Sequence, residues 1–295
     1  MEQEWDKKEE HAPVKSALIM EGGAMRGMFT CGVIDVLLEN EIPFDAAAGI
    51  SAGAVFGCNY ISRQIGRAIR YNKKYSRDRR YCSVWSLLTT GDLFGEEFCY
   101  RVLPDVLDPF DRETFRTNPT AFYVGATNVE TGKCCYHLCT DGKELDLKWM
   151  QASASMPLVS RPVSIDGRLF LDGGISDSVP YRHMEEIGYH RNVIILTQPE
   201  RYLKKKSKAT PLFRLLLKKY PAIAQAMIDR PEMYNRQMEE IKEREEAGTA
   251  FVIRPKESLG IGRTEKNPDE LERVYQLGRE EGKRSLPELK WFLGI

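Results

Sequence analysis

The 295-residue sequence has no apolar run long enough to cross a bilayer, which takes about 20 consecutive apolar residues. It also has no excess charge, because 43 lysines and arginines balance 43 aspartates and glutamates. Attraction to nucleic acid or to an anionic membrane would therefore have to be local, and we expect no nucleic-acid partner. The first 14 residues mix both charges and lack the hydrophobic segment of a secretory signal, so we expect a mobile tail over residues 1–14.

Disulfide and zinc patterns are also missing. The seven cysteines are odd in number, scattered, and include no C-x-x-C pair, which argues against a disulfide framework and favours a reducing, cytoplasmic compartment. The cluster CCYHLC would place Cys135, His137 and Cys139 on one face of a strand, because side chains alternate. A metal site there is one interpretation, and a half-buried strand is the simpler one.

What is present favours an α/β protein with a substantial core, since 42% of the residues are hydrophobic. The apolar run 15–20 ends in glycines, and residues 28–40 then show helical spacing. The pattern repeats with a strand over 44–50 and a helix from Ala52 to about Arg70. Repeated strand–helix units predict a parallel sheet with crossover helices.

Further strands are expected downstream. Segments 121–129 and 134–139 resemble neighbouring strands, and Asp166-Gly167 predicts a hairpin turn between RPVSI and RLFL. Residues 192–198 predict another strand, apolar in its middle. Between the strand–helix units that end near residue 70 and the strands that begin at residue 121, residues 71–118 are rich in aromatic and basic side chains. We expect helices and loops there that cover a cleft.

The composition changes after residue 200. We therefore expect a catalytic domain over 15–200 and an appended, mostly helical region over 201–295 that packs on it. Pro211, Pro221 and Pro231 separate three helical stretches, as proline does at helix starts. Residues 249–255 predict a strand that returns to the sheet, and a further helix runs from Asn267-Pro268 to about Arg284.

The stretch AAAGISAGAVFGC places Ser51 in a G-x-S-x-G pattern whose glycines are Gly49 and Gly53. In this motif a sharp strand-to-helix turn holds the serine in a strained, exposed position as a nucleophile. The strand before Ser51 and the helix after it are the context that the motif requires. The helix N-terminus would also offer N–H donors to a developing oxyanion.

The stretch EGGAMRG follows the first strand. Its turn can direct the backbone N–H groups of Gly22, Gly23 and Ala24 toward Ser51 as an oxyanion hole, and Arg26 could bind a substrate anion or order the loop. The competing interpretation is a dinucleotide fingerprint over Gly22, Ala24 and Gly27, with Glu39 or Glu41 as the ribose ligand. That alternative, a non-catalytic lipid- or nucleotide-binding protein, does not explain the serine motif.

A serine hydroxyl needs a base, and Asp172, in FLDGG before Gly173 and Gly174, ends a strand. His183 and His190 follow it in the Ser, Asp, His order of α/β-hydrolases, but they flank a helix-like segment. We therefore prefer Asp172 acting directly on Ser51. Because a carboxylate of ordinary pKa is a poor base for an alcohol, the pair needs a dry pocket, which residues 71–118 could supply.

Together, a glycine-rich loop with arginine, a G-x-S-x-G elbow one unit later and a distant D-G-G resemble the patatin-like phospholipase family, from about Ala17 to Pro199. The resemblance implies a three-layer α/β/α fold with a mostly parallel sheet, and bacterial members resemble this layout with a C-terminal helical extension. It implies a Ser–Asp lipid acyl hydrolase that acts on phospholipids or other acyl esters, without metal or organic cofactor. The implied nucleophile is Ser51, the base is Asp172, and the oxyanion donors are the N–H groups of Gly22, Gly23, Ala24 and Ala52.

Two positions depart from that family pattern. Glu21 stands where aspartate is common, and Ala24 stands where a third glycine is common, which has a steric cost if the site needs a positive φ. Outside the motifs, the segment YLKKKSKATPLFRLLLKKY over 202–220 mixes lysine with leucine and phenylalanine. It predicts either a helix in a lipid interface, and hence a peripheral membrane contact, or a solvated linker and a packed helix.

Overall fold

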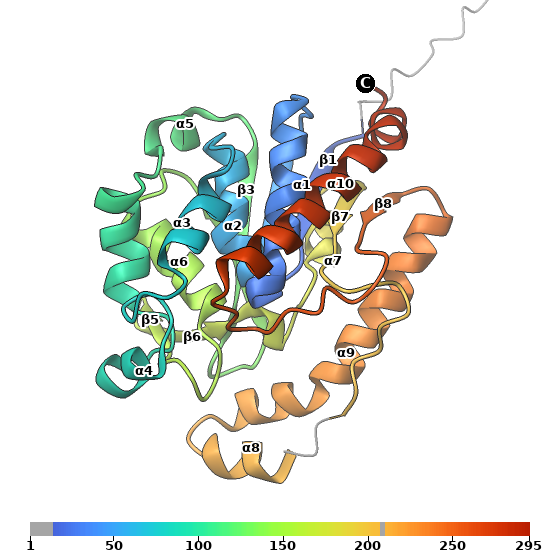
Figure 1. The fold of residues 1–295 in the computed structure, drawn as a ribbon. Helices are drawn as coiled ribbons and strands as arrows, with labels where there is room; N and C mark the ends of the chain where they lie inside the picture. The colour runs from blue at the N-terminus through green and yellow to red at the C-terminus, as the bar shows by residue number, and fades with distance from the viewer. Residues whose placement is uncertain (1–13, 207–209) are drawn as a thin grey trace, which may run out of the picture.

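The computed structural model describes residues 14–206 and 210–295, so the tail expected over 1–14 lies outside it except for Val14. One mixed sheet runs through the molecule, with helices on both faces (Figure 1). The strands are β1 (Ser16–Met20), β2 (Ala46–Ile50), β3 (Ala121–Asn128), β4 (Cys134–Cys139), β5 (Val163–Ile165), β6 (Arg168–Asp172), β7 (Arg191–Ile195) and β8 (Ala250–Ile253). The α-helices are α1 (Gly27–Glu39), α2 (Ala52–Ile61), α3 (Arg67–Tyr75), α4 (Val84–Thr90), α5 (Arg112–Thr117), α6 (Glu144–Ala154), α7 (Tyr181–Glu186), α8 (Thr210–Leu216), α9 (Pro221–Glu246) and α10 (Pro268–Leu293). Short 3-10 helices η1 (Ala24–Arg26) and η3 (Gly173–Ile175) and the π-helix η2 (Phe98–Leu107) complete the elements.

The sheet order is β5-β6-β3-β2-β1-β7-β8, with β4 also paired to β3. Strands β3, β2, β1, β7 and β8 are parallel, and β4, β5 and β6 join by antiparallel pairing. The predicted α/β class with a mostly parallel sheet is therefore confirmed. The predicted hairpin is also present, with Asp166 and Gly167 both at positive φ between β5 and β6.

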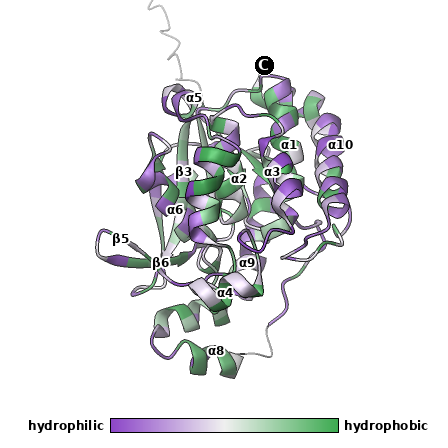
Figure 2. Cartoon of the chain, turned by 60° about the vertical axis from the view of Figure 1, so that its left-hand side comes forward, coloured by the Kyte–Doolittle hydropathy of each residue, from purple (hydrophilic) through white to green (hydrophobic). Residues whose placement is uncertain are grey.

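Alternation along β1 explains the three layers, because successive side chains point to opposite faces. Leu18 and Met20 belong to a core shared with α1, α2, α6 and α10. Ala17 and Ile19 point to a second core, shared with α7 and α9. Helix α2 is mostly apolar (Figure 2), and it is buried at nearly every position.

The region after residue 200 is part of this architecture. Strand β8 extends the sheet beside β7, as predicted, and α10 crosses α1 at close range. A Cβ at Gly32 would lie 2.1 Å from the Tyr275 carbonyl oxygen, and one at Gly278 would lie 2.0 Å from that of Phe29. Such an approach needs glycine on both helices. The division at residue 200 stays a prediction.

Three predicted helices differ from the observed ones. The helix expected from Ala52 to Arg70 ends at Ile61, because Arg63 and Gly66 adopt positive φ in a turn before α3. Pro231 lies inside α9 instead of starting a new helix. Likewise α10 continues past Arg284 to Leu293 with Pro287 inside it. Proline removes one helical hydrogen bond, and here packing on the core outweighs that loss.

The pairing along β3 determines which residues meet at the carboxyl edge of the sheet. Strand β2 pairs with β3 up to Ile50, opposite Gly125. The next β3 residue, Ala126, pairs with Asp172 of β6. Since β4 occupies the other edge of β3, β2 and β6 lie end to end on the same edge. This arrangement brings Ser51, the residue after β2, next to the end of β6.

Candidate active site

Ser51 lies on a sharp turn between β2 and α2. Its φ of 54° and ψ of −119° are unfavourable for a residue with a Cβ. The turn also brings α2 against β1, since a Cβ at Gly53 would lie 2.2 Å from the Met20 carbonyl oxygen. The predicted motif residues Gly49 and Gly53 thus lie on either side of a strained elbow that leaves the Ser51 side chain partly exposed.

A serine on α6 supports this elbow. The Ser51 N–H donates to Ser153 Oγ at 2.8 Å, and Ser153 Oγ donates to the Gly125 carbonyl oxygen at 2.6 Å. Ser153 therefore connects the elbow to β3 through a side chain that is fully buried. Sequence motifs do not point to this residue, because no local pattern distinguishes it from Ser155.

Asp172 is the partner of the Ser51 hydroxyl. Ser51 Oγ donates to Asp172 Oδ2 at 2.8 Å, and the Gly174 N–H donates to Asp172 Oδ1 at 2.8 Å. Gly173 and Gly174 begin η3, directly after the aspartate. Asp172 is only 5% exposed. Burial raises the pKa of Asp172, while the charge of Arg230, the Ser51 hydroxyl and the Gly174 N–H oppose that shift.

The glycine-rich loop lies directly beside Ser51. A Cβ at Gly22 would lie 2.9 Å from Ser51 Cβ, so only glycine fits there. Within the described residues, the backbone N–H groups of Gly22, Gly23, Ala24 and Ala52 donate no hydrogen bond. They are therefore available to an oxyanion formed near Ser51. Ala24 has a φ of 49°, so the steric cost expected from the missing glycine is present.

Glu21 anchors this loop. Its Oε2 accepts from the Thr197 N–H at 2.5 Å and from Thr197 Oγ1 at 3.0 Å, and its Oε1 accepts from the Tyr234 hydroxyl at 2.9 Å. These bonds connect β1, the segment after β7, and α9. Arg26 follows at the end of η1, before Gly27 starts α1, and it also lines the cavity beside Ser51.

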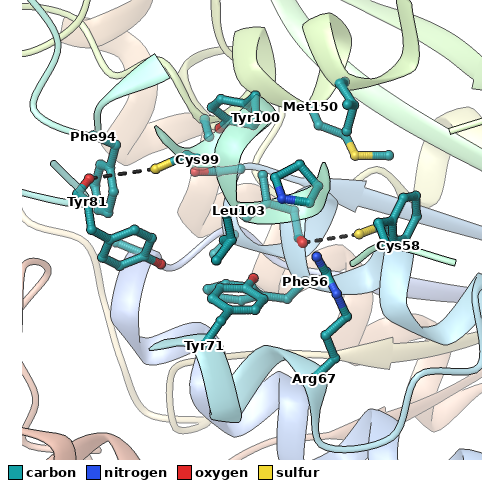
Figure 3. Close-up of a pocket in the computed structure, with 18 of the residues that line it drawn as sticks. Phe56, Cys58, Arg67, Tyr71, Tyr81, Phe94, Cys99, Tyr100, Leu103 and Met150 are labelled. Atoms are coloured by element: carbon teal, nitrogen blue, oxygen red, sulfur yellow. Dashed lines mark hydrogen bonds between the residues drawn. The ribbon is translucent and has the colours of Figure 1, made fainter. Parts of the chain in front are cut away.

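Two cavities meet at Ser51. The first is apolar and is lined mainly by α2, α3, η2 and α6, with Phe56, Tyr71, Leu103 and Met150 among its walls (Figure 3). As expected, the aromatic segment 71–118 supplies much of this lining. The second cavity has a volume of about 400 Å³ and is lined by the glycine loop, Asp172 and residues after 200. Ser51, Ala24 and Met156 border both cavities.

No histidine of residues 14–206 and 210–295 forms a hydrogen bond with Ser51 or Asp172, and His11 lies outside the described residues. His183 stacks on Tyr136 with ring centroids 3.7 Å apart. His190 is exposed just before β7, at the amino end of the parallel strands, whereas Ser51 follows the carboxyl end of β2. The described structure thus does not assemble a Ser, Asp, His triad.

The dinucleotide alternative is also poorly supported. Of its two candidate ribose ligands, Glu39 pairs with Arg279 at 2.7 Å and Glu41 is an exposed turn residue. Both lie at the far end of α1, away from the glycine loop at its start. Neither carboxylate is positioned as that fingerprint requires.

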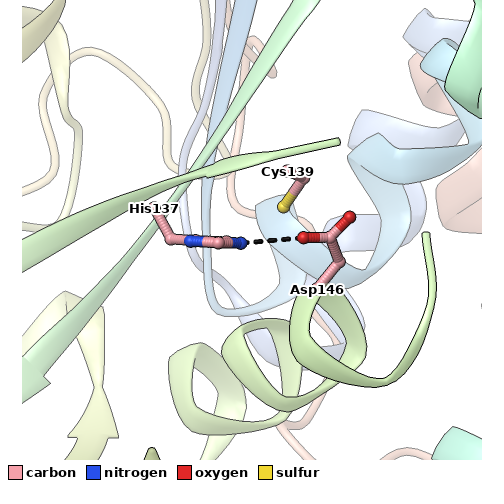
Figure 4. Close-up of side chains that lie close together, drawn as sticks. All are labelled: His137, Cys139 and Asp146. Atoms are coloured by element: carbon pink, nitrogen blue, oxygen red, sulfur yellow. Dashed lines mark hydrogen bonds and ion pairs between the residues drawn. The ribbon is translucent and has the colours of Figure 1, made fainter. Parts of the chain in front are cut away.

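The CCYHLC strand contributes to one possible ligand cluster, formed by His137, Cys139 and Asp146 (Figure 4). Cys135 is not part of it. Asp146 Oδ1 is 2.7 Å from His137 Nε2, and Oδ2 accepts from three backbone N–H groups of residues 140–142. Burial alone would raise the pKa of Asp146, but these bonds lower it. Both oxygens of the Asp146 carboxylate already accept hydrogen bonds, so the cluster is better explained as a structural contact that joins β4 to α6 than as a metal site. All seven cysteines are free.

Comparison with known protein families identifies the family of this chain. The profile of the patatin-like phospholipase family matches residues 18–184, which include most of β1, the Ser51 elbow and Asp172. The chain belongs to the patatin-like phospholipase family. A second profile, described as a domain of unknown function (DUF6363), matches residues 220–294.

Relatives of this patatin-like chain include two kinds of protein. It is 31% identical over 192 residues to the uncharacterized protein YjjU of Escherichia coli. That match covers 63% of this chain and 53% of YjjU. It is 26% identical over 176 residues to lysophospholipase nte1 of Aspergillus niger, covering 58% of this chain and 11% of nte1. The chain thus matches about half the length of YjjU and a small part of nte1.

Among solved structures, VipD from Legionella pneumophila aligns with a TM-score of 0.48 at 13% identity, over 94% of this chain and 67% of VipD. No helix in the described part of this patatin-like protein is long and apolar enough to cross a membrane.

Proposed function

We propose that the protein is a serine acyl hydrolase that cleaves carboxylic esters of lipids with a Ser51–Asp172 dyad. The observation that carries this proposal is the 2.8 Å hydrogen bond from Ser51 Oγ to a buried carboxylate, at the junction of two cavities. Membership of the patatin-like phospholipase family supports it, as does the similarity to a protein named lysophospholipase.

In the first half-reaction, Asp172 accepts the hydroxyl proton while Ser51 Oγ attacks the ester carbonyl carbon. The carbonyl oxygen becomes an oxyanion, which the N–H groups of Gly22, Gly23, Ala24 and Ala52 stabilise. The protonated Asp172 then donates its proton to the leaving alkoxide, and the C–O ester bond breaks. The products are a free alcohol and an acyl group on Ser51.

In the second half-reaction, Asp172 accepts a proton from water as the water oxygen attacks the acyl carbon. Collapse of the second oxyanion returns the proton to Ser51 Oγ and releases a carboxylic acid. The raised pKa of Asp172 makes it a stronger base than an exposed aspartate, which the reaction requires because an alcohol is a weak acid.

The two cavities define how the ester substrate would be oriented at Ser51. The apolar cavity beside α2 and α6 suits the acyl chain, because its walls are mostly aromatic and aliphatic. The second cavity then receives the alcohol part of the substrate. With the carbonyl group between them, its oxygen lies toward the glycine loop, next to Ser51.

The test is covalent labelling of the folded protein with a fluorophosphonate, together with hydrolysis of p-nitrophenyl esters from acetate to dodecanoate. We expect the label on the peptide that contains Ser51, and turnover that responds to acyl length because one cavity holds the chain. Ser51→Ala protein is the matched control and should take up no label. A folded wild-type protein with neither label nor turnover would leave a non-catalytic lipid- or nucleotide-binding role.

We also propose that this hydrolase acts at an anionic lipid surface. Leu212, Leu215 and Leu216 of α8 are 48%, 70% and 54% exposed, and Leu88 of α4 is 80% exposed. Figures 1 and 2 both place α4 and α8 at the same end of the molecule. Phe213 of α8 lines the second cavity, so this apolar surface borders the site. The exposed side chains of Arg214, Lys218 and Lys219 supply the positive charge that an anionic bilayer attracts.

Vesicle sedimentation measures this contact. The double variant Leu88→Asp, Leu215→Asp is expected to reduce the fraction bound to phosphatidylglycerol-containing vesicles about tenfold, because both changes place charge in the interface. Trp291→Asp is the control, since Trp291 is 85% exposed near the C-terminus, at the opposite end in Figure 1. Equal binding of the wild-type protein to neutral and anionic vesicles would contradict the electrostatic part of the proposal.

A further inference from the structure

The second cavity is unusually cationic where it receives the alcohol part of the substrate. Four basic side chains and two carboxylates line it, and the two carboxylates are Glu21 and Asp172. Both are already engaged, Glu21 by Thr197 and Tyr234 and Asp172 by Ser51 and a backbone N–H. The basic residues are Arg26, Lys204, Arg230 and Arg263.

These four cations form no salt bridge with any described residue. Arg26 Nε is buried and has no hydrogen-bond partner within the described part of the chain. Two other partly exposed arginines do pair with carboxylates, Arg279 with Glu39 and Arg244 with Glu185. The lining of the cavity therefore has an excess of positive charge, with four cations against the two carboxylates of Glu21 and Asp172.

Arg230 is held directly beside the dyad. Its Nε donates to the Gly174 carbonyl oxygen at 2.5 Å, which leaves the outer guanidinium nitrogens free. A Cβ at Gly174 would lie 3.1 Å from Asp172 Oδ1 and 3.3 Å from Arg230 Nη2, so the carboxylate and the guanidinium flank the same glycine. A group bound to Arg230 would thus lie close to the reacting ester.

Lys204 is fixed on the other side by α9. Its backbone N–H donates to Asn235 Oδ1 at 2.8 Å, and Asn235 Nδ2 donates back to its carbonyl oxygen at 3.1 Å. The ammonium group lies 3.7 Å from the centre of the Tyr234 ring. Burial and the neighbouring guanidinium groups lower the pKa of Lys204 to about 7, against the opposite effect of Glu21. A bound anion would restore the charged lysine.

We propose that Arg26, Lys204, Arg230 and Arg263 bind a phosphate monoester, and that the preferred substrates are acyl esters whose alcohol part carries a terminal phosphate. This inference rests on the proposed function and narrows it to acidic lipids of the monoacylglycerol phosphate type. Arginine and lysine around a partly enclosed cavity are the usual partners of a phosphate dianion. Two of the four, Arg230 and Arg263, come from the region matched by the profile of unknown function.

The same cavity is unsuited to a choline head group. A quaternary ammonium needs carboxylates or open aromatic faces. Both carboxylates are engaged, and Lys204 already occupies the Tyr234 ring, one of three aromatic rings in the lining beside those of Tyr202 and Phe213. Four nearby cations would repel a further positive charge. Selectivity between a phosphate monoester and phosphocholine therefore follows from the charges that line the cavity.

The experiment compares three soluble esters with the same octanoyl chain, namely monooctanoyl glycerol, its 3-phosphate and its phosphocholine derivative. We expect kcat/KM for the phosphate monoester to exceed the other two by about tenfold or more, as charge-assisted hydrogen bonds allow. Lys204→Gln and Arg263→Gln should each reduce that ratio about tenfold, mainly through KM. Lys242→Gln, an exposed lysine of α9 outside the cavity, is the matched control.

A second measurement distinguishes a site for free phosphate from a site for the phosphate of a lipid. Glycerol 3-phosphate and inorganic phosphate are added to the assay of the neutral ester, and glycerol 3-phosphate is expected to inhibit competitively. Inhibition by inorganic phosphate combined with a substrate ratio near one would overturn the lipid assignment. An unchanged ratio in both cavity variants would overturn the site itself.

Failure of the proposed function is distinguishable from failure of this inference. A protein that hydrolyses the neutral and phosphorylated esters equally is an acyl hydrolase without the phosphate site. If no ester of any kind is cleaved, calorimetric titration with glycerol 3-phosphate still tests the site. Wild-type binding that Lys204→Gln weakens about tenfold supports the site, and the absence of wild-type binding refutes it.

Discussion

Replacing Asp172 by asparagine is expected to reduce kcat/KM for ester hydrolysis by a factor of about 10³ or more, as removal of a catalytic base typically does. Asparagine has nearly the same shape and can keep the hydrogen bond from the Gly174 N–H. It cannot accept the proton of Ser51. The loss should therefore appear in kcat, while labelling by a fluorophosphonate becomes slow.

Asp166→Asn is the matched control for that variant. Asp166 lies in the exposed β5–β6 turn, at the other end of the strand that carries Asp172. Asparagine tolerates its positive φ, so activity should stay close to wild type. If Asp172→Asn retains activity within tenfold of wild type, another group acts as the base.

The raised pKa of Asp172 also predicts two effects of pH. Activity should fall as pH decreases through the folded-state pKa, which lies above the ordinary value near 3.9 because burial disfavours the carboxylate. The same shift destabilises the folded protein above that pKa, and the effect disappears as pH falls toward the unfolded value. Asp172→Asn should therefore melt at or above the wild-type temperature at pH 7.5, with a smaller difference at pH 4.5.

Sequence motifs drew attention to both Ser51 and Asp172, which the structure joins by a hydrogen bond, because each motif is encoded locally. Ser51 follows a strand and precedes a helix within a recognisable pattern, and Asp172 ends a strand before two glycines. Their contact, however, depends on β2 and β6 sharing one edge of β3. Spacing along the chain contains no information about that edge, so the 2.8 Å hydrogen bond becomes visible only in the folded arrangement of the strands.

The residues around Ser51 and Asp172 were less predictable for the same reason. Ser153 supports the elbow from 102 positions away, and no motif marks it. Arg230 reaches the site from α9, a helix that the sequence pattern predicts as two separate helices with a boundary at Pro231. Proline is a helix breaker in isolation, and only the packing of α9 on the sheet shows that the helix continues. Long-range packing therefore determines where α9 lines the second cavity, which local sequence patterns could not predict.

The role of Glu21 shows how a departure from a family pattern can be accommodated. At this position the longer carboxylate reaches both Thr197 and Tyr234, and so connects the glycine loop to α9. The loop beside Ser51 and the cationic wall of the second cavity are thus held by one buried side chain. Residues after 200 are consequently integral to the candidate site.

Ser51→Ala and Ser51→Gly are both expected to reduce kcat by a factor of about 10⁴ or more, because neither side chain can form the acyl-enzyme. The two variants should nevertheless differ in stability. Ser51 has a φ of 54° and a ψ of −119°, a conformation that glycine adopts at little cost and that alanine does not. The glycine variant should therefore be more stable than the alanine variant by about 1–3 kcal/mol in urea denaturation.

Ser62 provides the matched comparison for the elbow. It ends the same helix, α2, with a φ of −78°, which any residue accepts. There the order should reverse, with Ser62→Ala more stable than Ser62→Gly by up to about 1 kcal/mol, because glycine loses more backbone freedom on folding. Equal stabilities of the two Ser51 variants would show that the turn is not strained. Ester hydrolysis retained by both of them would place the nucleophile on another residue, since neither variant keeps an oxygen that can attack the carbonyl carbon.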